Sequence, residues 1–356
     1  MRTSHKGRKL DRRGSLIGSL VFAEDDEKLG LVRRINELEI ELKDPTLVNP
    51  ASVHNNLANT LMKSGKIEAA IKHYKEALEL NKEDAAAYMN LGVAFKHLAQ
   101  FEKALDYFKK SLRIRPTADE HYNMANTFLK LEPPDYGSAV EHYKEALRMD
   151  PEHADCHQNL GLALKNEGKL DAALMELRSA LKLSDGGDVN AHYNLGNTLV
   201  SKANVLEGEA RGKALSEAIE HYKEAAALSP DDPDIKTNLA ITYAKMGNGV
   251  EAVAHYLDVM KLQPGDATTH FNCGNALLLQ EDYQGAIEQF KESMILDKEC
   301  LDSQYNLGMT LMQAGSFEEA CNTLEDYLVS TADDDDEDEG EFDVDGTDKL
   351  NDEVRV

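Results

Sequence analysis

Small and apolar side chains recur along most of the chain with a period close to 34 residues. In the stretch that begins at Ala51, two of them are Leu57 and Leu61, at positions 7 and 11, which form one stripe of an α-helix. A second stripe combines alanine at position 20 with an aromatic residue or leucine at position 24, here Ala70 and Tyr74. A glycine near position 15 separates the stripes in four units. Each unit therefore predicts a hairpin of two helices.

The unit recurs eight times between about residues 51 and 330. Position 6 is always asparagine: Asn56, Asn90, Asn123, Asn159, Asn194, Asn238, Asn272 and Asn306. Position 20 is always alanine, and small residues at positions 8 and 20 allow the two backbones to approach while the larger residue at 24 fills the adjacent space. One hairpin cannot bury its own apolar face, but stacked hairpins can. The sequence therefore predicts an all-α solenoid of about eight helix-turn-helix repeats.

Two repeats are longer than the others. The third has two extra residues around Pro133 and Pro134, in the turn between its helices. The fifth has ten extra residues within about 201–216. Solenoids accept such insertions at one edge. The fifth-repeat insertion is either a longer helix pair without a role or a partner-specific protrusion.

The two ends of the chain differ from the repeats in charge. The whole chain has a net charge of −26, yet residues 1–20 carry six basic groups against one acid, and residues 332–356 carry thirteen acids against two basic groups. Like charges and scarce apolar residues predict a disordered basic tail over 1–24 and a disordered acidic tail over 331–356. Between the basic tail and the repeats, Leu31, Ile35, Leu38 and Leu42 predict an amphipathic capping helix within 25–44.

Composition excludes several classes of partner and location. The strong negative charge disfavours binding to nucleic-acid backbones. No apolar run approaches the roughly 18 residues of a membrane span, and the short run at 16–23 is broken and followed by acids, so neither a membrane partner nor a leader is expected. Four scattered cysteines suit a reducing compartment, which predicts a cytoplasmic or nuclear protein.

The repeat resembles the tetratricopeptide repeat in its Asn-Leu-Gly run, its apolar residue at position 11, its alanine at 20 and its proline at 32. The runs at 191–199, 73–78 and 142–147 look most similar to the superhelices of the O-linked N-acetylglucosamine transferases. The resemblance implies a right-handed superhelix with a concave groove. In those enzymes a glycosyltransferase domain would follow the repeats, whereas an acidic tail follows here, so their activity is not implied.

The asparagine at position 6 is the strongest candidate for function. It points about 200° away from the packing stripe of its helix. An asparagine within a helix costs roughly 0.5–0.7 kcal/mol relative to alanine, so eight of them call for a compensating role. Two amide donors and one acceptor suit the main chain of an extended peptide, and the resemblance implies that this row grips peptide in the groove. Alternatively, each asparagine bonds to the neighbouring repeat and sets the stacking angle, and both roles can coexist.

Positions 9 and 2 add to the candidate peptide-binding surface. Position 9 is polar in odd repeats, with Asn59, Asn126, Asn197 and Asn275, and apolar in even repeats, with Val93, Leu162, Ile241 and Met309. This alternation indicates either descent from a two-repeat unit or alternating pockets. Positions 2 and 6 carry no Lys or Arg, so the carboxylate clamp of chaperone-binding repeats is not expected. Acids at position 2 (Asp119, Asp155, Asp234 and Asp302) favour a neutral or basic ligand segment, or form a solvated face.

Histidines occupy position 4 (His54, His121, His157, His192 and His270) and position 23 (His73, His142, His221 and His255). Successive repeats would separate their rings by about a helix diameter, ~10 Å, against metal–nitrogen bonds near 2 Å. They are therefore predicted to be packing residues. His153, Cys156 and His157 form a weak metal candidate, as does the calcium-loop-like segment 341–352. No cofactor or metal is expected.

Catalytic motifs are not found in the sequence. It has no glycine-rich phosphate loop, Gly-x-Ser-x-Gly or His-Glu-x-x-His, and adjacent helical residues such as Cys156 and His157 point about 100° apart. Ser15 follows Arg12-Arg13-Gly14 and is a candidate phosphorylation site for a basophilic kinase. The C-terminal Val354-Arg355-Val356 is a candidate ligand for a carboxylate-binding groove.

These features together predict a non-catalytic scaffold or adaptor that binds an extended neutral or basic segment of another protein through the asparagine row. One alternative is an acidic chaperone for basic clients such as histone-like or ribosomal proteins. A second alternative is the targeting subunit of a separate glycosyltransferase. The tails could also pair with each other and occlude the groove until Ser15 is phosphorylated.

Overall fold

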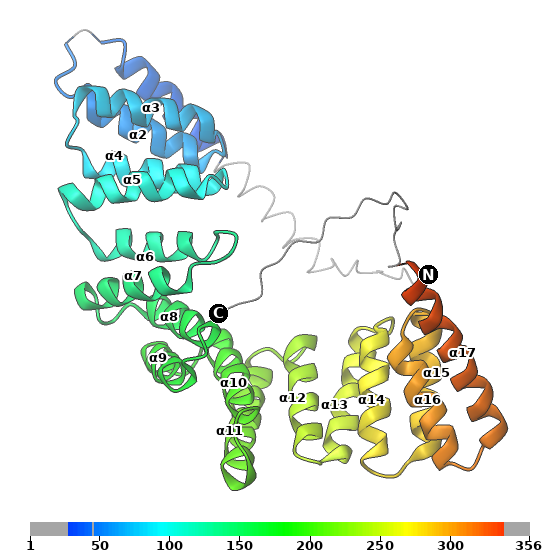
Figure 1. Cartoon of the computed structure of the whole chain (residues 1–356). Helices are drawn as coiled ribbons and strands as arrows, with labels where there is room; N and C mark the ends of the chain where they lie inside the picture. The colour runs from blue at the N-terminus through cyan, green and yellow to red at the C-terminus, as the bar shows by residue number, and fades with distance from the viewer. Residues whose placement is uncertain (1–27, 45, 338–356) are drawn as a thin grey trace, which may run out of the picture. The chain divides into compact units, whose positions relative to one another are not determined.

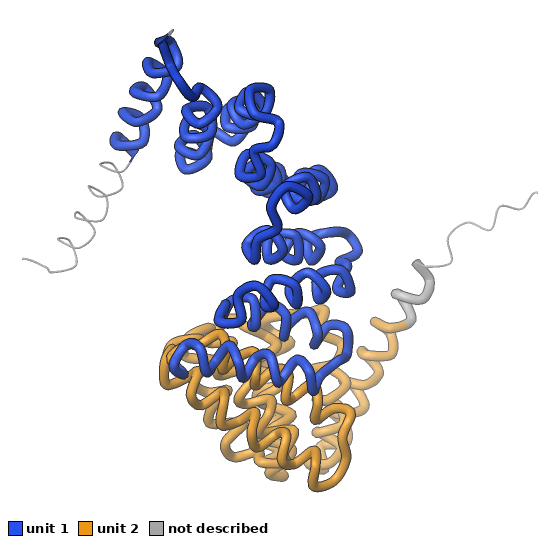
Figure 2. The backbone as a smooth tube through the Cα atoms, turned by 90° about the vertical axis from the view of Figure 1, so that its left-hand side faces the viewer, with its two compact units in different colours: residues 1–186 blue, residues 187–356 orange. Residues whose placement is uncertain are grey.

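The computed structural model describes residues 28–44 and 46–337, and within these residues every regular element is an α-helix. The chain divides into two compact units, residues 1–186 (unit 1) and 187–356 (unit 2), which are coloured separately in Figure 2. Both units consist of helical hairpins. The predicted all-α fold of stacked helix pairs is therefore confirmed.

Unit 1 contains one helix over residues 28–41 and four hairpins. Its hairpin helices are α2 (Pro50–Lys63), α3 (Ile67–Leu80), α4 (Ala85–His97), α5 (Phe101–Ile114), α6 (Ala118–Phe128), α7 (Tyr136–Met149), α8 (Ala154–Asn166) and α9 (Leu170–Leu183). The two helices of each hairpin pack against each other, and the second helix packs on the first helix of the next hairpin (Figure 1).

Unit 2 repeats this arrangement with four more hairpins. Its helices are α10 (Val189–Ala203), α11 (Gly208–Leu228), α12 (Pro233–Lys245), α13 (Gly249–Leu262), α14 (Ala267–Leu278), α15 (Tyr283–Leu296), α16 (Leu301–Gln313) and α17 (Phe317–Glu337). Helices α12 to α17 lie side by side in Figure 1, each in contact with its neighbours in sequence.

Polar side chains determine where many of the helices begin. Asn49 accepts a hydrogen bond from the backbone N–H of Ser52, and Pro50 occupies the first helical position, where it loses no hydrogen bond. Aspartates serve the same purpose before α4, α7, α10, α12, α14 and α15. These caps satisfy N–H groups that a helix leaves without partners in its first turn, so the helices that carry them begin at a defined residue.

The predicted packing between positions 8 and 24 is present in the core. A methyl group added at Gly92 would lie 2.5 Å from the ring of Phe108, and one at Gly196 would lie 2.6 Å from the ring of Tyr222. Both ring-bearing side chains are almost fully buried. Glycine at position 8 therefore allows the two helices of a hairpin to approach until the side chain at 24 rests on the backbone.

The extra residues of the fifth repeat lengthen its helices. Helix α10 has 15 residues and α11 has 21, and only residues 204–207 separate them. The added turns bury Ala203, Ala214 and Leu215 in a small apolar cluster of their own. Of the two predicted possibilities, the longer helix pair is what the structure shows, while a partner-binding role for it stays a prediction.

The ends of the repeat block differ slightly from the predicted boundaries. In the predicted capping segment, residues 28–41 are helical and bury Ile35 and Leu38 against the first repeat. Helix α17 continues to Glu337, past residue 331, where the disordered tail is predicted to begin. Extending an existing helix fixes one residue for each new hydrogen bond, which makes continuation easier than nucleation. The remainder of both predicted tails lies outside the described residues.

Candidate functional site

The asparagines at positions 6 and 9 lie on the first helices of the hairpins, and none is fully buried. Asn56 and Asn59 are exposed, and the other ten are partly exposed. The row at position 6 comprises Asn56, Asn90, Asn123 and Asn159 in unit 1, and Asn194, Asn238, Asn272 and Asn306 in unit 2. Adjoining helices therefore do not wall these side chains in.

In even repeats the asparagine at position 6 binds the preceding repeat. Asn159 Nδ2 donates to Asn126 Oδ1 at 3.2 Å and to the Tyr122 hydroxyl at 3.1 Å. The other even repeats make the same bond, from Asn90 to Asn59 at 3.1 Å, from Asn238 to Asn197 at 3.2 Å, and from Asn306 to Asn275 at 2.9 Å. A bond to the neighbouring repeat, on which the predicted alternative role depends, is thus present in all four even members of the row.

The asparagine at position 9 is the shared acceptor of this connection. In the third repeat the hydroxyl of Tyr143 donates to Asn126 Oδ1 at 2.5 Å, and burial raises the pKa of Tyr143, so that the hydroxyl keeps its proton. Tyr74 with Asn59 and Tyr222 with Asn197 repeat the bond at 2.6 Å each. One carbonyl oxygen therefore joins the tyrosine of its own repeat to the asparagine of the next. This network explains the alternation at position 9, and reasoning from helix periodicity missed it.

Three odd repeats have a position-6 amide without a partner among the described residues. Asn56, Asn194 and Asn272 make no side-chain hydrogen bond with any described residue, whereas Asn123 accepts from Lys96 Nζ at 3.0 Å and donates to the Asp119 carbonyl. The Nδ2 groups at position 9 likewise donate to no described residue. In the described part of the chain, the one polar side-chain atom that is both buried and unpartnered is Asn55 Oδ1. The unpartnered amide groups at positions 6 and 9 are therefore not buried and reach the surface.

A hollow of about 620 Å³ in unit 1 adjoins two members of the asparagine network. Its lining consists of Lys96, Phe101, Asn126, Leu129, Lys130 and Asn159. Burial lowers the pKa of Lys96, whose ammonium group donates to Asn123. Two lysines beside two carboxamides suit an acidic side chain, which the prediction of neutral or basic ligands did not include. The lysine at position 12 of the second repeat is the feature of the sequence that could have indicated this preference for an acidic side chain.

The histidines at positions 4 and 23 meet within one repeat, not between repeats. Their Nδ1 atoms lie 3.0 Å apart for His54 and His73, 2.8 Å for His121 and His142, and 3.0 Å for His192 and His221. The ~10 Å spacing applies to rings on successive repeats and did not anticipate this contact within one repeat. Positions 4 and 23 face each other across the two helices of the same hairpin.

The predicted weak metal candidate in the fourth repeat does not assemble. His153 Nδ1 caps α8 by accepting from the Cys156 backbone N–H at 3.3 Å. The Cys156 thiol donates to the Tyr143 carbonyl at 3.5 Å, and His157 Nδ1 contacts Glu176 Oε2 at 2.7 Å. The three side chains have separate partners. In the described residues, His54, His73 and Glu76 form the one group with metal-ligand spacing.

Burial makes Cys156 a poor nucleophile. It raises the pKa of this thiol to about 12, so the reactive thiolate is scarce at neutral pH. The pKa of Cys273 is raised to about 11 for the same reason.

Four predicted features lie outside the described residues. They are the phosphorylation candidate Ser15, the basic tail over 1–24, the calcium-loop-like segment 341–352 and the C-terminal Val354-Arg355-Val356. Among the helices that the structure describes, none has the length and apolar character needed to cross a membrane.

Sequence comparison relates the chain to known repeat proteins. Profiles of the tetratricopeptide repeat match residues 49–117, 142–175, 237–296 and 277–337, and a TPR repeat profile matches 211–247. The BBSome complex member BBS4 of Bos taurus is 28% identical over 265 residues, which cover 68% of this chain and 51% of BBS4. Protein O-mannosyl-transferase TMTC3 of Mus musculus is 28% identical over 272 residues, which cover 71% of this chain and 28% of TMTC3.

The chain thus spans about half the length of BBS4 and less of TMTC3. Among solved structures, the C-terminal part of a TPR repeat-containing protein from Cytophaga hutchinsonii has a TM-score of 0.57 at 16% identity, covering 70% of this chain and 97% of that one. This likeness shows the fold alone. The finer resemblance to O-linked N-acetylglucosamine transferases stays a prediction.

Proposed function

The chain is a tetratricopeptide repeat protein, and we propose that it is a non-catalytic scaffold that holds an extended segment of another protein along its first helices. The amides of the odd repeats carry this proposal. Asn56, Asn194 and Asn272 occupy helix positions where asparagine is unfavourable, and none of them makes a side-chain hydrogen bond with the described residues. The main chain of a bound peptide offers the carbonyl and N–H groups that such amides require.

The position-9 asparagines support the same proposal. Their Oδ1 atoms are occupied by the tyrosine and asparagine bonds, while their Nδ2 groups face the surface. The network therefore holds each amide in a fixed orientation with its donors free. Holding the donors in place before binding reduces the entropy lost when a peptide arrives.

Charges along the first helices refine the kind of segment proposed. The acids at position 2, such as Asp234 and Asp302, are exposed and favour neutral or basic residues. The hollow with Lys96 and Lys130 in unit 1 instead favours a carboxylate. The proposed partner is thus a protein segment of mixed charge, not a nucleic acid, and its free C-terminus is not what is recognised.

The relative BBS4 is named as a member of a complex, which supports a role in assembly. We place the protein in the cytoplasm or nucleus because its four cysteines are free, as a reducing compartment would keep them. The acidic chaperone and the targeting subunit of a glycosyltransferase are the competing functions. An assay of glycosyl transfer to a peptide, with and without a separate catalytic partner, tests the targeting-subunit alternative.

The decisive experiment uses a display library of random linear peptides selected on the full chain. The combined variant Asn56→Ala, Asn194→Ala and Asn272→Ala is expected to bind the selected peptides at least about tenfold more weakly, since each lost hydrogen bond is worth about 1 kcal/mol. Asn322→Ala is the matched control, because this exposed asparagine lies on the second helix of its hairpin. Equal affinity of the triple variant and the wild type contradicts the proposal.

A salt titration of the same peptides separates backbone capture from an acidic chaperone. Hydrogen bonding to the main chain is expected to persist from low to physiological salt. Binding that depends on net charge is screened over a Debye length of about 8 Å at physiological ionic strength and collapses. Collapse, together with selection of uniformly basic peptides, favours the chaperone instead.

A further inference from the structure

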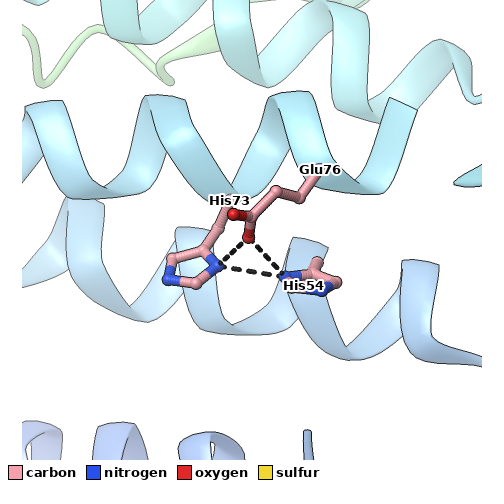
Figure 3. A group of neighbouring side chains, drawn as sticks. All are labelled: His54, His73 and Glu76. Carbon is pink, nitrogen blue, oxygen red and sulfur yellow. Dashed lines mark hydrogen bonds and ion pairs between the residues drawn. The ribbon is translucent and has the colours of Figure 1, made fainter. Parts of the chain in front are cut away.

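Three potential metal ligands of the first repeat converge on one point. His54 lies on α2, and His73 and Glu76 lie one turn apart on α3, with all three side chains pointing toward one another (Figure 3). The Nδ1 atoms of the two rings are 3.0 Å apart. Glu76 Oε2 lies 3.1 Å from His54 Nδ1 and 2.9 Å from His73 Nδ1. The three atoms form a nearly equilateral triangle.

Protons alone cannot make all three contacts favourable. A neutral imidazole carries one proton, at either of its two ring nitrogens. If both Nδ1 atoms carry hydrogen, the two N–H groups face each other. If one carries hydrogen, the lone pair of the other ring faces the carboxylate oxygen.

A cation would satisfy the three atoms together. Zinc binds histidine nitrogen at about 2.0–2.1 Å and carboxylate oxygen at about 2.0–2.2 Å. Bonds of that length at 90–109° place neighbouring ligand atoms roughly 2.9–3.4 Å apart, which matches the triangle. We infer that the first repeat binds a Zn²⁺ ion through His54 Nδ1, His73 Nδ1 and Glu76 Oε2. Water, or a donor atom of a bound protein, completes the coordination.

The surroundings of the triangle favour an ion over a purely structural contact. The side chains of His54, His73 and Glu76 are 17%, 22% and 33% exposed, so an ion can reach them. Lys72 Nζ lies 3.9 Å from the other oxygen of Glu76, Oε1, so that Oε2 remains directed toward the rings. Two imidazoles and one carboxylate suit zinc better than magnesium or calcium, which prefer oxygen ligands.

The third repeat shows what completes the ligand set. Residues 142–146 repeat the His-Tyr-Lys-Glu-Ala run of residues 73–77, and the histidine pair is also present. There, however, Glu145 pairs with Arg148 Nε at 2.9 Å. The corresponding residue of the first repeat is Glu79, which is exposed and cannot attract Glu76. The pairing with Arg148 therefore holds the carboxylate away in the third repeat, while the fifth repeat has the same run and histidine pair with Ala227 at this position, and Glu224 forms no metal-spaced group with them in the described residues.

Zinc titration of the full chain against a chromophoric chelator, with excess Mg²⁺ to cover the acidic residues and a reductant present, tests the site. One tight equivalent is expected in the wild type. His54→Gln and Glu76→Gln are each expected to weaken it by more than about tenfold. His121→Gln, in the histidine pair that lacks a carboxylate, is the matched control and is expected to leave it unchanged.

A second variant tests the role of the carboxylate without touching a ligand. Glu79→Arg is expected to draw Glu76 away, as Arg148 draws Glu145, and to weaken zinc binding by a similar factor. Glu83→Arg, also exposed, makes the same change of charge as a control. Co²⁺ in place of Zn²⁺ should give visible bands without thiolate charge transfer. Thiolate bands, or equal affinity in wild type, His54→Gln and Glu79→Arg, overturn the assignment.

Discussion

Odd and even repeats place the same residue at position 6 but give it different partners. In even repeats, Asn159 and its equivalents donate to the preceding repeat, while in odd repeats Asn56, Asn194 and Asn272 make no side-chain hydrogen bond with the described residues. The acceptor, an asparagine at position 9, is present only in odd repeats. A row that is uniform in sequence therefore divides into stacking contacts and amides available for binding.

The comparison also identifies the repeating structural element of this chain. An odd repeat supplies a tyrosine or phenylalanine at position 24 and an asparagine at position 9, and the following even repeat supplies the donor at position 6. The hydrogen-bond pattern thus has a period of two repeats. This two-repeat pattern gives the polar–apolar alternation at position 9 a physical cause, whether or not it also reflects descent.

The largest expected effect comes from removing the shared acceptor. Asn126→Leu gives the third repeat the residue that the fourth has at Leu162. It leaves the Tyr143 hydroxyl without its acceptor and removes one of the two acceptors of Asn159 Nδ2, which keeps the Tyr122 hydroxyl. One unsatisfied hydroxyl and one lost bond between repeats are expected to lower the free energy of unfolding by about 2–4 kcal/mol, measured by urea denaturation. Asn275→Leu is the matched control, because Phe290 replaces the tyrosine there and only Asn306 loses its acceptor. A cost as large for Asn275→Leu would show that the tyrosine bond contributes nothing.

Replacing the position-6 asparagine by alanine is expected to have a smaller effect on stability, with opposite signs in even and odd repeats. Asn238→Ala loses bonds to Asn197 and to the Tyr193 hydroxyl and is expected to destabilise unit 2 by about 1 kcal/mol. Asn272→Ala loses no such bond and is expected to stabilise it by roughly 0.5 kcal/mol through helix propensity. Thermal denaturation of both variants measures the difference. Equal destabilisation would mean that the odd asparagines also support the fold.

The smallest expected effect concerns pH and the histidine pairs, which occur in odd repeats. Burial, above all, lowers the pKa of His121 and His142 below the ordinary value of 6.5. Well above pH 6.5 the two histidine rings are neutral in both the folded and the unfolded chain. As the pH falls below 6.5, the rings of the unfolded chain bind protons first. Stability is therefore expected to fall as the pH decreases from about 7.5 to about 5.5.

The second repeat supplies the control for this pH dependence, because Tyr88 and Tyr107 stack where the third repeat has histidines. The double variant His121→Tyr and His142→Tyr is expected to lose less stability over the same interval in urea titrations at each pH. An unchanged slope would assign the acid sensitivity to other groups.

The sequence predicted a large part of the fold because the repeat period places particular residues on particular helix faces. Gly92 under the ring of Phe108 illustrates this, since small residues at 8 and 20 with a large residue at 24 already indicate close helices. The asparagine row was also found from the sequence, and its proposed contact with peptide awaits its test. By contrast, the pairing of His54 with His73 was missed, because their distance depends on how two helices face each other.

The periodicity of the sequence alone determined that residues 51–330 form helical hairpins and that asparagines would stand clear of the packing stripe. Tertiary structure decided which amides bond to a neighbouring repeat and that Lys96 and Lys130 line the same hollow. It also decided that Glu76 contacts two histidines while Glu145 pairs with an arginine. The physical reason is the range of the interactions. A helix face follows from residues three or four apart, whereas a hydrogen bond between helices depends on differences of tenths of an ångström between residues far apart in sequence.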